Sequence, residues 1–481
     1  MKEIKGIQRI YFLGIGGIGM SALARYFKSN GITVSGYDKT ETVLTKKLVE
    51  EGIAVHYDDN IEFIDKGAEL VVYTPAVPKD HKELNYFLQN NYELVKRSEV
   101  LGAITNSSYN ICIAGTHGKT TTSTMVAHIL RHSGYGCNAF LGGIAVNYDT
   151  NFWLQTPGEG SQKNVSVVEA DEYDRSFLKL SPDVAIISSM DPDHLDIYGT
   201  AENMEQAFID FSAKIKPGGM LLSKYGLKRT EDLKADEHLT FHLHNVNASV
   251  YAANIQMING SYSFDVLMQY WELKDVVLNM GGLHNIENMI AAISVAHYLE
   301  IDNDKIRDAV ADFRGVKRRF EYIVKEASPF GGGLVGAVMV DDYAHHPEEL
   351  RALLTGAKEL FPGKKCTVIF QPHLYSRTRD LADGFAEALD LADEVILLPI
   401  YPARELPVEG VNSEMILNKM KNKNKRVLSK ENLLKYLESC QVSPPAGGGD
   451  LEGALLITAG AGDIDTLVEP IKKIINSKLG K

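Results

Sequence analysis

A glycine-rich segment near the middle of the chain carries the residues best suited to phosphate chemistry. Residues 115–122 read GTHGKTTT and follow an apolar stretch, 110–114, with the character of a buried strand. Glycines let a backbone wrap an anion while N–H groups point at it. Lys119 would reach the outer phosphates, and the Thr120 hydroxyl would hold Mg²⁺. Ile113 stands where the general phosphate loop has glycine, so a glycine turn with a solvated lysine is the alternative.

A second glycine loop lies near the N-terminus. Residues 14–19 read GIGGIG between an expected strand, 10–13, and an expected helix, and Asp38 follows the next strand, 32–37. This is the dinucleotide-binding pattern, and it predicts a nucleotide diphosphate on a helix N-terminus. It does not distinguish NAD from a UDP-sugar, and a tight turn without a ligand is the alternative.

Acidic clusters follow two later strands of the central region. The expected strand 165–168 is followed by EADEYD, which begins with Glu169, and a later strand is followed by DPDHLD at 191–196. Ligands of open α/β sheets gather beyond the carboxyl ends of the strands, where a phosphate loop needs further Mg²⁺ ligands. Glu169 is the best carboxylate candidate, and His194 could bind a metal through a neutral ring nitrogen. Solvated turns and a helix-capping histidine are the alternatives.

Two polar clusters of the C-terminal region also follow expected strands. Residues 341–347 read DDYAHHP, and residues 371–379 read QPHLYSRTR. Histidine and arginine gathered at strand ends suit a carboxylate-bearing substrate or a transferring phosphate. His345 and His346 are adjacent and cannot both face one way from a strand, so one of them is expected to be structural.

Length, net charge and cysteine content indicate the general class of protein. At ~100–200 residues per domain, 481 residues predict about three domains. A net charge of -13 disfavours nucleic-acid binding as the main role. The four cysteines form no CxxC pair, and the sequence shows no signal peptide and no run of ~18 apolar residues. We therefore expect a cytoplasmic protein that neither spans a membrane nor contains structural disulfides.

Apolar strands that alternate with amphipathic helices predict an α/β fold with doubly wound sheets. We call residues 14–19 the first glycine loop and residues 115–122 the phosphate loop. The expected domains are residues 1–107 with the first glycine loop, 108–320 with the phosphate loop and a mixed or parallel sheet, and 321–481 with a second parallel sheet. Polar and apolar residues alternate within 244–280, which favours antiparallel strands there.

The motifs, in their order along the chain, resemble those of the Mur ligase family from residue 7 to about residue 470. The matching segments are FLGIGGIGMSALA, the phosphate loop, VEADEYDRSF, MDPDHLDIYG, GLHNIENMIAA, FRGVKRRFE, DDYAHHPEEL, FQPHLYSRTRD, IYPARE and GAGDID. The opening segment is most similar to the branch of the family that adds L-alanine. The resemblance implies an N-terminal Rossmann-like UDP-binding domain, a central ATPase domain and a C-terminal Rossmann-like domain that binds the amino acid.

The same resemblance implies an ATP-dependent ligase of peptidoglycan precursor synthesis, and hence a role in cell wall biogenesis, cell shape and cell division. The lactyl carboxylate of UDP-N-acetylmuramate would attack the γ-phosphate of ATP, and the amine of L-alanine would displace phosphate from the acyl phosphate. The products would be UDP-N-acetylmuramoyl-L-alanine, ADP and phosphate. Such chemistry needs mainly positioning and charge neutralisation. We expect a monomer or a homodimer with small-molecule substrates.

Site roles implied by the resemblance fall into five groups. ATP binding is implied for Gly115, Thr116, His117, Gly118, Lys119, Thr120, Thr121, Asn285, Asn288 and Arg318. Binding of Mg²⁺ is implied for Thr120, Glu169 and His194. Binding of the UDP-sugar is implied for Gly14, Gly16, Gly17, Ile18, Gly19, Asp38 and Thr74. The alanine site would contain Tyr343, His373 and Arg377, and the catalytic residues would be Lys119, His194, His373 and Arg377.

The chain departs from the family pattern at a few positions. Ala344 stands where DDYGHH is common, and His56-Tyr57 and His81 stand where glycine-histidine and asparagine are expected around the UDP-sugar. These departures concern the UDP-sugar pocket and leave the ATP loop unaffected.

Three other functions are compatible with parts of the sequence. A ligase that adds a recycled tripeptide to the same UDP-sugar would keep nearly every motif, although the opening glycine loop argues against it. An NAD-dependent oxidoreductase would use the first glycine loop but would not explain the phosphate loop. A non-catalytic nucleotide-binding regulator would not need the intact set of Lys119, Thr120, Glu169 and His194.

Overall fold

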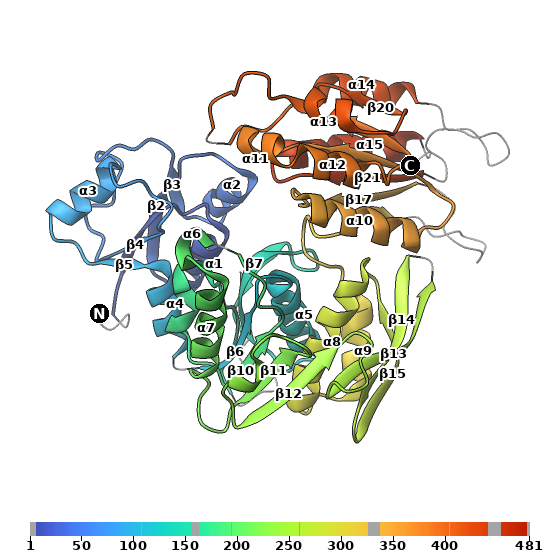
Figure 1. The fold of residues 1–481 in the computed structure, drawn as a ribbon. Helices are drawn as coiled ribbons and strands as arrows, with labels where there is room; N and C mark the ends of the chain where they lie inside the picture. The colour runs from blue at the N-terminus through green and yellow to red at the C-terminus, as the bar shows by residue number, and fades with distance from the viewer. Residues whose placement is uncertain are drawn as a thin grey trace. The chain divides into compact units, whose positions relative to one another are not determined.

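The computed structural model describes residues 6–106, 108–155, 163–193, 195–258, 260–325, 337–403, 405–440 and 454–478. Figure 1 shows an α/β protein in which helices accompany three β-sheets. The chain divides into two compact units. The first comprises Met1–Ala252, Val266–Leu273 and Glu287–Val310, and the second comprises Ala253–Asp265, Lys274–Ile286 and Ala311–Lys481.

The first sheet is parallel and has the strand order β3-β2-β1-β4-β5. Its strands are β1 (Arg9–Leu13), β2 (Thr33–Tyr37), β3 (Ala54–His56), β4 (Leu70–Tyr73) and β5 (Leu94–Lys96). Its helices are α1 (Ile18–Ser29), α2 (Val43–Glu50), α3 (Lys82–Gln89) and α4 (Arg97–Thr105). Because all five strands are parallel, the loops after them, including the glycine loop after β1, lie along one edge.

The second sheet has ten strands in the order β15-β14-β13-β12-β11-β10-β6-β9-β7-β8. They are β6 (Tyr109–Ala114), β7 (Asn138–Ala145), β8 (Thr150–Trp153), β9 (Val165–Glu169), β10 (Val184–Ile187), β11 (Met220–Lys224), β12 (Glu237–His242), β13 (Val250–Ile258), β14 (Ser261–Met268) and β15 (Trp271–Leu278). Neighbours β13, β14 and β15 are joined by two-residue connections, which only antiparallel strands allow. This agrees with the alternation seen in 244–280.

Helical segments of this central part connect the strands. They are α5 (Lys119–His132), the 3-10 segment η1 (Tyr173–Lys179), α6 (Leu195–Tyr198), α7 (Ala201–Ser212), the 3-10 segment η2 (Thr230–Asp232), α8 (Leu283–Tyr298) and α9 (Asn303–Asp312). Strands β9 and β10 both pair in parallel with β6, so the loops that follow these three strands meet at one edge of the sheet. That edge carries the phosphate loop.

The third sheet has the order β16-β17-β21-β18-β19-β20, and only β16 runs antiparallel to its neighbour. Its strands are β16 (Glu321–Lys325), β17 (Val338–Asp342), β18 (Lys365–Phe370), β19 (Glu394–Leu397), β20 (Lys425–Val427) and β21 (Ala454–Ala459). The helices are α10 (Pro347–Leu360), α11 (Tyr375–Asp380), α12 (Ala382–Leu389), α13 (Ser413–Lys419), α14 (Lys430–Ser439), the 3-10 segment η3 (Asp463–Leu467) and α15 (Val468–Lys478). The predicted α/β class with three domains is confirmed.

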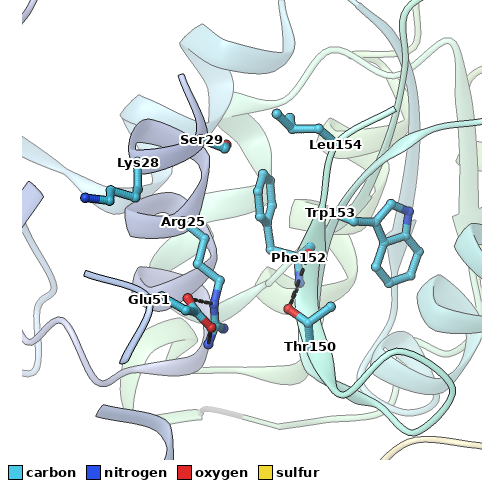
Figure 2. Close-up of a pocket in the computed structure, with 8 residues that line it drawn as sticks. All are labelled: Arg25, Lys28, Ser29, Glu51, Thr150, Phe152, Trp153 and Leu154. Carbon is cyan, nitrogen blue, oxygen red and sulfur yellow. Dashed lines mark hydrogen bonds and ion pairs between the residues drawn. The ribbon is translucent and has the colours of Figure 1, made fainter. Parts of the chain in front are cut away.

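Helix α1 is fixed to strand β8 within the first unit. Arg25, nearly buried, pairs with Glu51 at 2.7 Å and donates to the Asn151 side chain at 2.5 Å. Asn151 in turn donates to the carbonyl of Ile18 at 2.6 Å. An open pocket of about 360 Å³ lies at this junction. Figure 2 shows the residues that line it, which are Arg25, Lys28, Ser29, Glu51, Thr150, Phe152, Trp153 and Leu154. None of these eight is a predicted site residue, so we assign the junction a role in holding the start of α1.

A buried polar network surrounds Glu83 beside the first sheet. The Tyr11 hydroxyl lies 2.7 Å from Oε2 of Glu83 and 2.6 Å from Nε2 of His56, and the amide of Asn60 donates to Oε1 of Glu83 at 3.2 Å. His81 caps α3 and lies 3.3 Å from Asp59. The amide of Glu83 also donates to Asp59 at 3.1 Å, so two of the departures from the family pattern, His56 and His81, belong to one network.

Glu83 makes the stability of this domain depend on pH. Burial raises the pKa of Glu83 to about 7, so the folded state binds a proton that the unfolded state releases above its ordinary pKa. Stability is therefore highest below about pH 4.5 for this group and falls as pH rises to about 7. We compare the free energies of unfolding of Glu83→Gln and wild type. As pH rises from 5 to 8, their difference should change by up to about 3 kcal/mol in favour of Glu83→Gln.

Urea denaturation of both proteins at pH 5 and pH 8 measures this effect. Glu62→Gln is the control, because Glu62 is an exposed glutamate of the same domain. A difference between Glu83→Gln and wild type that stays the same at both pH values would show that Glu83 does not titrate on folding.

The described residues bear on two expectations from the sequence, which concern disulfides and membrane-spanning helices. Cys112, Cys137, Cys366 and Cys440 are all buried, and none of them forms a disulfide within the described part of the chain. Within the described ranges, no helix has the length and the apolar character needed to cross a membrane.

Candidate active site

The phosphate loop has the backbone geometry that the sequence predicts. Gly115 and Gly118 have φ of 134° and 83°, a region that favours glycine. A Cβ on Gly115 would lie 2.2 Å from the hydroxyl of Ser188, so only glycine fits there. Gly118 is the N-cap of α5, with no side-chain cap and no acidic residue in the first turn. The positive end of α5 is thus available to an anion.

Lys119 is held by the protein itself at the start of α5. Its ammonium donates to the carbonyl of Gly115 at 2.6 Å and lies 2.8 and 2.7 Å from the two carboxylate oxygens of Glu172. Burial raises the pKa of Glu172, and the charge of Lys119 acts in the opposite direction. Glu172 is therefore the charge partner of Lys119 in this structure.

Two serines that follow β10 support the loop. The Ser189 hydroxyl accepts from the amide of His117 at 2.8 Å and lies 2.8 Å from the Thr116 hydroxyl. Ser188 donates to the carbonyl of His117. The sequence interpretation missed both serines and placed the functional cluster of this strand at 191–196. Their position after a strand that neighbours β6 was the available signal.

The oxygen ligands expected for Mg²⁺ meet at the same edge. Glu169 ends β9 opposite Ile113 of β6, and its Oε2 accepts from the amide of Gly142 at 2.9 Å. Thr120 is buried in the first turn of α5. His194 lies outside the described residues. No group of three or more His, Cys, Asp or Glu side chains forms a metal site in the described ranges. A hydroxyl and a carboxylate do suit Mg²⁺, which keeps waters and phosphate oxygens as ligands.

The two asparagines of α8 are placed differently. A Cβ on Gly118 would lie 2.7 Å from Oδ1 of Asn288, so Asn288 contacts the phosphate loop within the first unit. Asn285 is buried and donates to the carbonyl of Gly281 at 2.6 Å within the second unit. Asn288 thus contacts the phosphate loop within a single unit, whereas Asn285 belongs to the other unit.

The first glycine loop is built as the pattern requires. The amide of Gly16 donates to Asp38 at 2.8 Å, and Gly17 is the N-cap of α1 without a side-chain cap. A Cβ on Gly14 would lie 2.8 Å from the methyl group of Thr74. A Cβ on Gly19 would lie 2.8 Å from Nη1 of Arg97, a residue that sequence interpretation did not select. The structure therefore gathers Asp38, Thr74 and Arg97 around the loop.

Arg318 belongs to the second unit and is bound to the end of β21. Its guanidinium donates to the carbonyl of Gly460, lies 3.5 Å from Asp341 and stacks over the Tyr343 ring at 5.1 Å. Its backbone carbonyl also accepts from the amide of Tyr343 at 2.7 Å. Burial raises the pKa of Asp341 to about 7, which Arg318 opposes. Arg318 thus positions Tyr343.

His373 and Arg377 lie together after β18. Nδ1 of His373 and Nη1 of Arg377 are buried without a hydrogen-bond partner among the described residues. The His373 ring stacks on Tyr401 at 5.8 Å. Burial lowers the pKa of His373, as do the charges of Arg377 and His345. The arginine N–H is a buried donor without an acceptor, which is costly, and a ligand carboxylate would satisfy it, whereas Nδ1 of His373 donates or accepts according to its tautomer.

The two adjacent histidines have different roles, as predicted. His346 caps α10, where its ring accepts from the amide of Glu348 at 3.4 Å. His345 instead lies between Tyr343 and His373, with ring centroids 5.2 and 6.3 Å away. Sequence interpretation missed Glu405, which accepts from the amide of Ser376 at 2.9 Å and fixes the start of α11.

Family comparisons match most of the chain. Residues 9–109 match the Mur ligase family catalytic domain, residues 113–296 the Mur ligase middle domain, and residues 318–462 the Mur ligase glutamate ligase domain. These three segments coincide with the three sheets.

Curated relatives match from end to end. The chain is 47% identical over 480 residues to the UDP-N-acetylmuramate–L-alanine ligase of Cytophaga hutchinsonii, covering 99% of this chain and 98% of the relative. It is 46% identical over 477 residues to the enzyme of the same name from Porphyromonas gingivalis strain W83, covering 98% and 100%.

Solved structures share the fold. The UDP-N-acetylmuramate–alanine ligase of Thermotoga maritima matches with a TM-score of 0.78 and 29% identity over 98% of this chain and 99% of that chain. The murein peptide ligase of Psychrobacter arcticus matches with a TM-score of 0.64 and 22% identity over 99% and 98%. Since the curated relatives share nearly half of their residues with it over its whole length, the chain belongs to the Mur ligase family.

Proposed function

We propose that the protein joins L-alanine to the lactyl carboxylate of UDP-N-acetylmuramate at the expense of ATP, as a step in peptidoglycan precursor synthesis. The observation that carries this proposal is 47% sequence identity over nearly the whole length to a relative named for that reaction. In this proposal, the glycine loop after β1 would bind the UDP-sugar, the phosphate loop after β6 would bind ATP, and the buried polar groups after β18 would bind the amino acid.

The phosphate loop supplies charge neutralisation in this proposal. Lys119 would leave Glu172 for the outer phosphates of ATP, with Gly115 and Gly118 wrapping the phosphate chain. The lactyl carboxylate then attacks the γ-phosphorus, which gives an acyl phosphate and ADP. Such a transfer is accelerated chiefly by alignment and by cations near the developing charge. Asn288 would contact the nucleotide, and we place Asn285 and Arg318 near it on the basis of the resemblance.

Thr120, Glu169 and His194 would hold Mg²⁺, which neutralises the phosphate oxygens when bound. Thr120 and Glu169 offer oxygen ligands of the kind that Mg²⁺ prefers.

The amino-acid site would use groups that follow β17 and β18. Arg377 would bind the alanine carboxylate through its buried Nη1. Burial lowers the pKa of His373, which favours the neutral ring, and a neutral ring nitrogen would be the group that accepts a proton from the alanine ammonium. The amine would then attack the acyl phosphate, and phosphate would leave. Tyr343 and the ring of Tyr401 would form the walls of the site.

We also propose domain boundaries, a cellular location and an oligomeric state. We assign residues 1–107 to the UDP-sugar domain, 108–320 to the ATPase domain and 321–481 to the amino-acid domain. We propose a cytoplasmic location, and four buried cysteines that form no disulfide in the described residues are compatible with it. We propose a monomer or a homodimer, which sedimentation would decide.

A phosphate-release assay tests the function directly. The protein is incubated with ATP, Mg²⁺ and UDP-N-acetylmuramate, with or without L-alanine. We expect release that needs every component, and a product heavier than the UDP-sugar by one alanine residue. The second candidate is ligation of a recycled tripeptide, because the fold of a murein peptide ligase also matches. Release with the tripeptide but not with alanine would favour it.

A further inference from the structure

Arg97 lies between the two glycine loops of the first unit. It is the first residue of α4 and directly follows β5, so it shares the edge of the first sheet with the glycine loop after β1. A Cβ on Gly19 would lie 2.8 Å from Nη1 and 3.3 Å from Cζ of Arg97. The guanidinium therefore lies directly against the loop that is expected to hold a diphosphate.

The other end of the Arg97 guanidinium faces the central domain. Nη2 donates to Asp171 at 3.1 Å, and the other carboxylate oxygen of Asp171 accepts from the amide of Tyr173 at 3.1 Å. The residue that follows Asp171 is Glu172, which holds Lys119 at 2.7 Å. Arg97, Asp171, Glu172 and Lys119 thus form a continuous set of contacts from one glycine loop to the other.

Arg97 has the capacity to bind a second anion. Guanidinium has five N–H donors in a planar fork that suits phosphate oxygens. Within the described ranges, hydrogen bonds from the Arg97 side chain go to Asp171 alone. The side chain is 21% exposed and can therefore be reached by a ligand. In a chain of net charge -13, a diphosphate also needs a local cation.

We infer that Arg97 binds the diphosphate of the UDP-sugar and, through its bond to Asp171, couples occupancy of this loop to the ATP loop. The inference rests on the proposed function. A bound diphosphate competes with Asp171 for the guanidinium, and Asp171 then holds the segment with Glu172 less firmly. Because Lys119 must leave Glu172 to contact ATP, the UDP-sugar and ATP should tighten each other's binding. Such coupling is reciprocal by thermodynamic necessity.

Calorimetric titrations measure both parts of the inference. The ligands are UDP-N-acetylmuramate and a non-hydrolysable ATP analogue with Mg²⁺, each titrated alone and in the presence of the other. For the wild type, we expect each ligand to lower the Kd of the other by at least about fivefold. For Arg97→Ala, we expect the Kd of the UDP-sugar to rise by about 10- to 100-fold and the coupling factor to approach about 1. Arg97→Lys should restore part of the UDP-sugar affinity.

The Asp171→Asn variant tests the coupling between the two loops separately from the binding of the UDP-sugar. It retains Arg97, so the Kd of the UDP-sugar should stay within about threefold of wild type while the coupling factor approaches about 1. Lys96→Ala is the matched control, because Lys96 precedes Arg97 and makes a similar pair with Asp174 at 3.2 Å. That variant should retain both the affinity and the coupling.

Three outcomes would overturn the inference. A UDP-sugar Kd for folded Arg97→Ala that stays within about twofold of wild type would remove Arg97 from the substrate site. Unchanged coupling in Asp171→Asn, or no coupling in a wild type that binds both ligands, would remove the link between the loops. A folded wild type that binds no UDP-sugar would overturn the proposed function as well. Thermal melting of every variant establishes that it is folded.

Discussion

Lys119→Ala should lower the turnover of ATP by about 10²- to 10³-fold or more, because it removes the cation that would stabilise charge on the transferring phosphate. Lys119 is 14% exposed and starts α5 at the phosphate loop, where it is already paired with a carboxylate. The measurement is the rate of phosphate release at saturating ATP, UDP-N-acetylmuramate and L-alanine.

Lys216→Ala is the control for this substitution. Lys216 belongs to the same unit and pairs with Asp183 at 2.7 Å, but it is not part of the phosphate loop. Its loss should leave turnover nearly unchanged. Turnover of Lys119→Ala equal to that of Lys216→Ala would exclude Lys119 from the chemical step.

Arg377→Ala should raise the KM for L-alanine by about 100-fold and the KM for ATP by less than about threefold. Its Nη1 is buried with no partner among the described residues, which suits an incoming carboxylate. Alanine offers only a carboxylate, an amine and a methyl group, so one lost ion pair removes much of its binding energy. Steady-state kinetics with each substrate varied in turn measure the two constants.

Arg379→Ala is the matched control, because Arg379 lies two residues away on the same helix but is 53% exposed and pairs with Asp380 at 2.7 Å. We expect little change in either KM. A larger effect of Arg377→Ala on the KM for ATP than on that for alanine would place Arg377 at the nucleotide instead.

The local sequence determined the elements and the loops that carry chemistry. Apolar runs such as 110–114 and 165–168 became β6 and β9 almost residue for residue, because buried parallel strands leave a short continuous apolar signal. The glycine positions also followed from sequence, since Gly115 and Gly118 adopt backbone conformations that side chains disfavour. The roles given to the site residues, from Lys119 and Glu169 to Arg377, all remain predictions.

Tertiary structure alone decided which side chains meet. No spacing could show that Glu172 holds Lys119, because the two are 53 residues apart and meet through the pairing of β6 with β9. Arg97 had no motif of its own, and only the packing of α4 brings it to both Gly19 and Asp171. The hydrophobic periodicity of a segment indicates which of its faces is buried. Which residues pack against that face depends on the strand order. That order is set by long-range packing, which local sequence does not record.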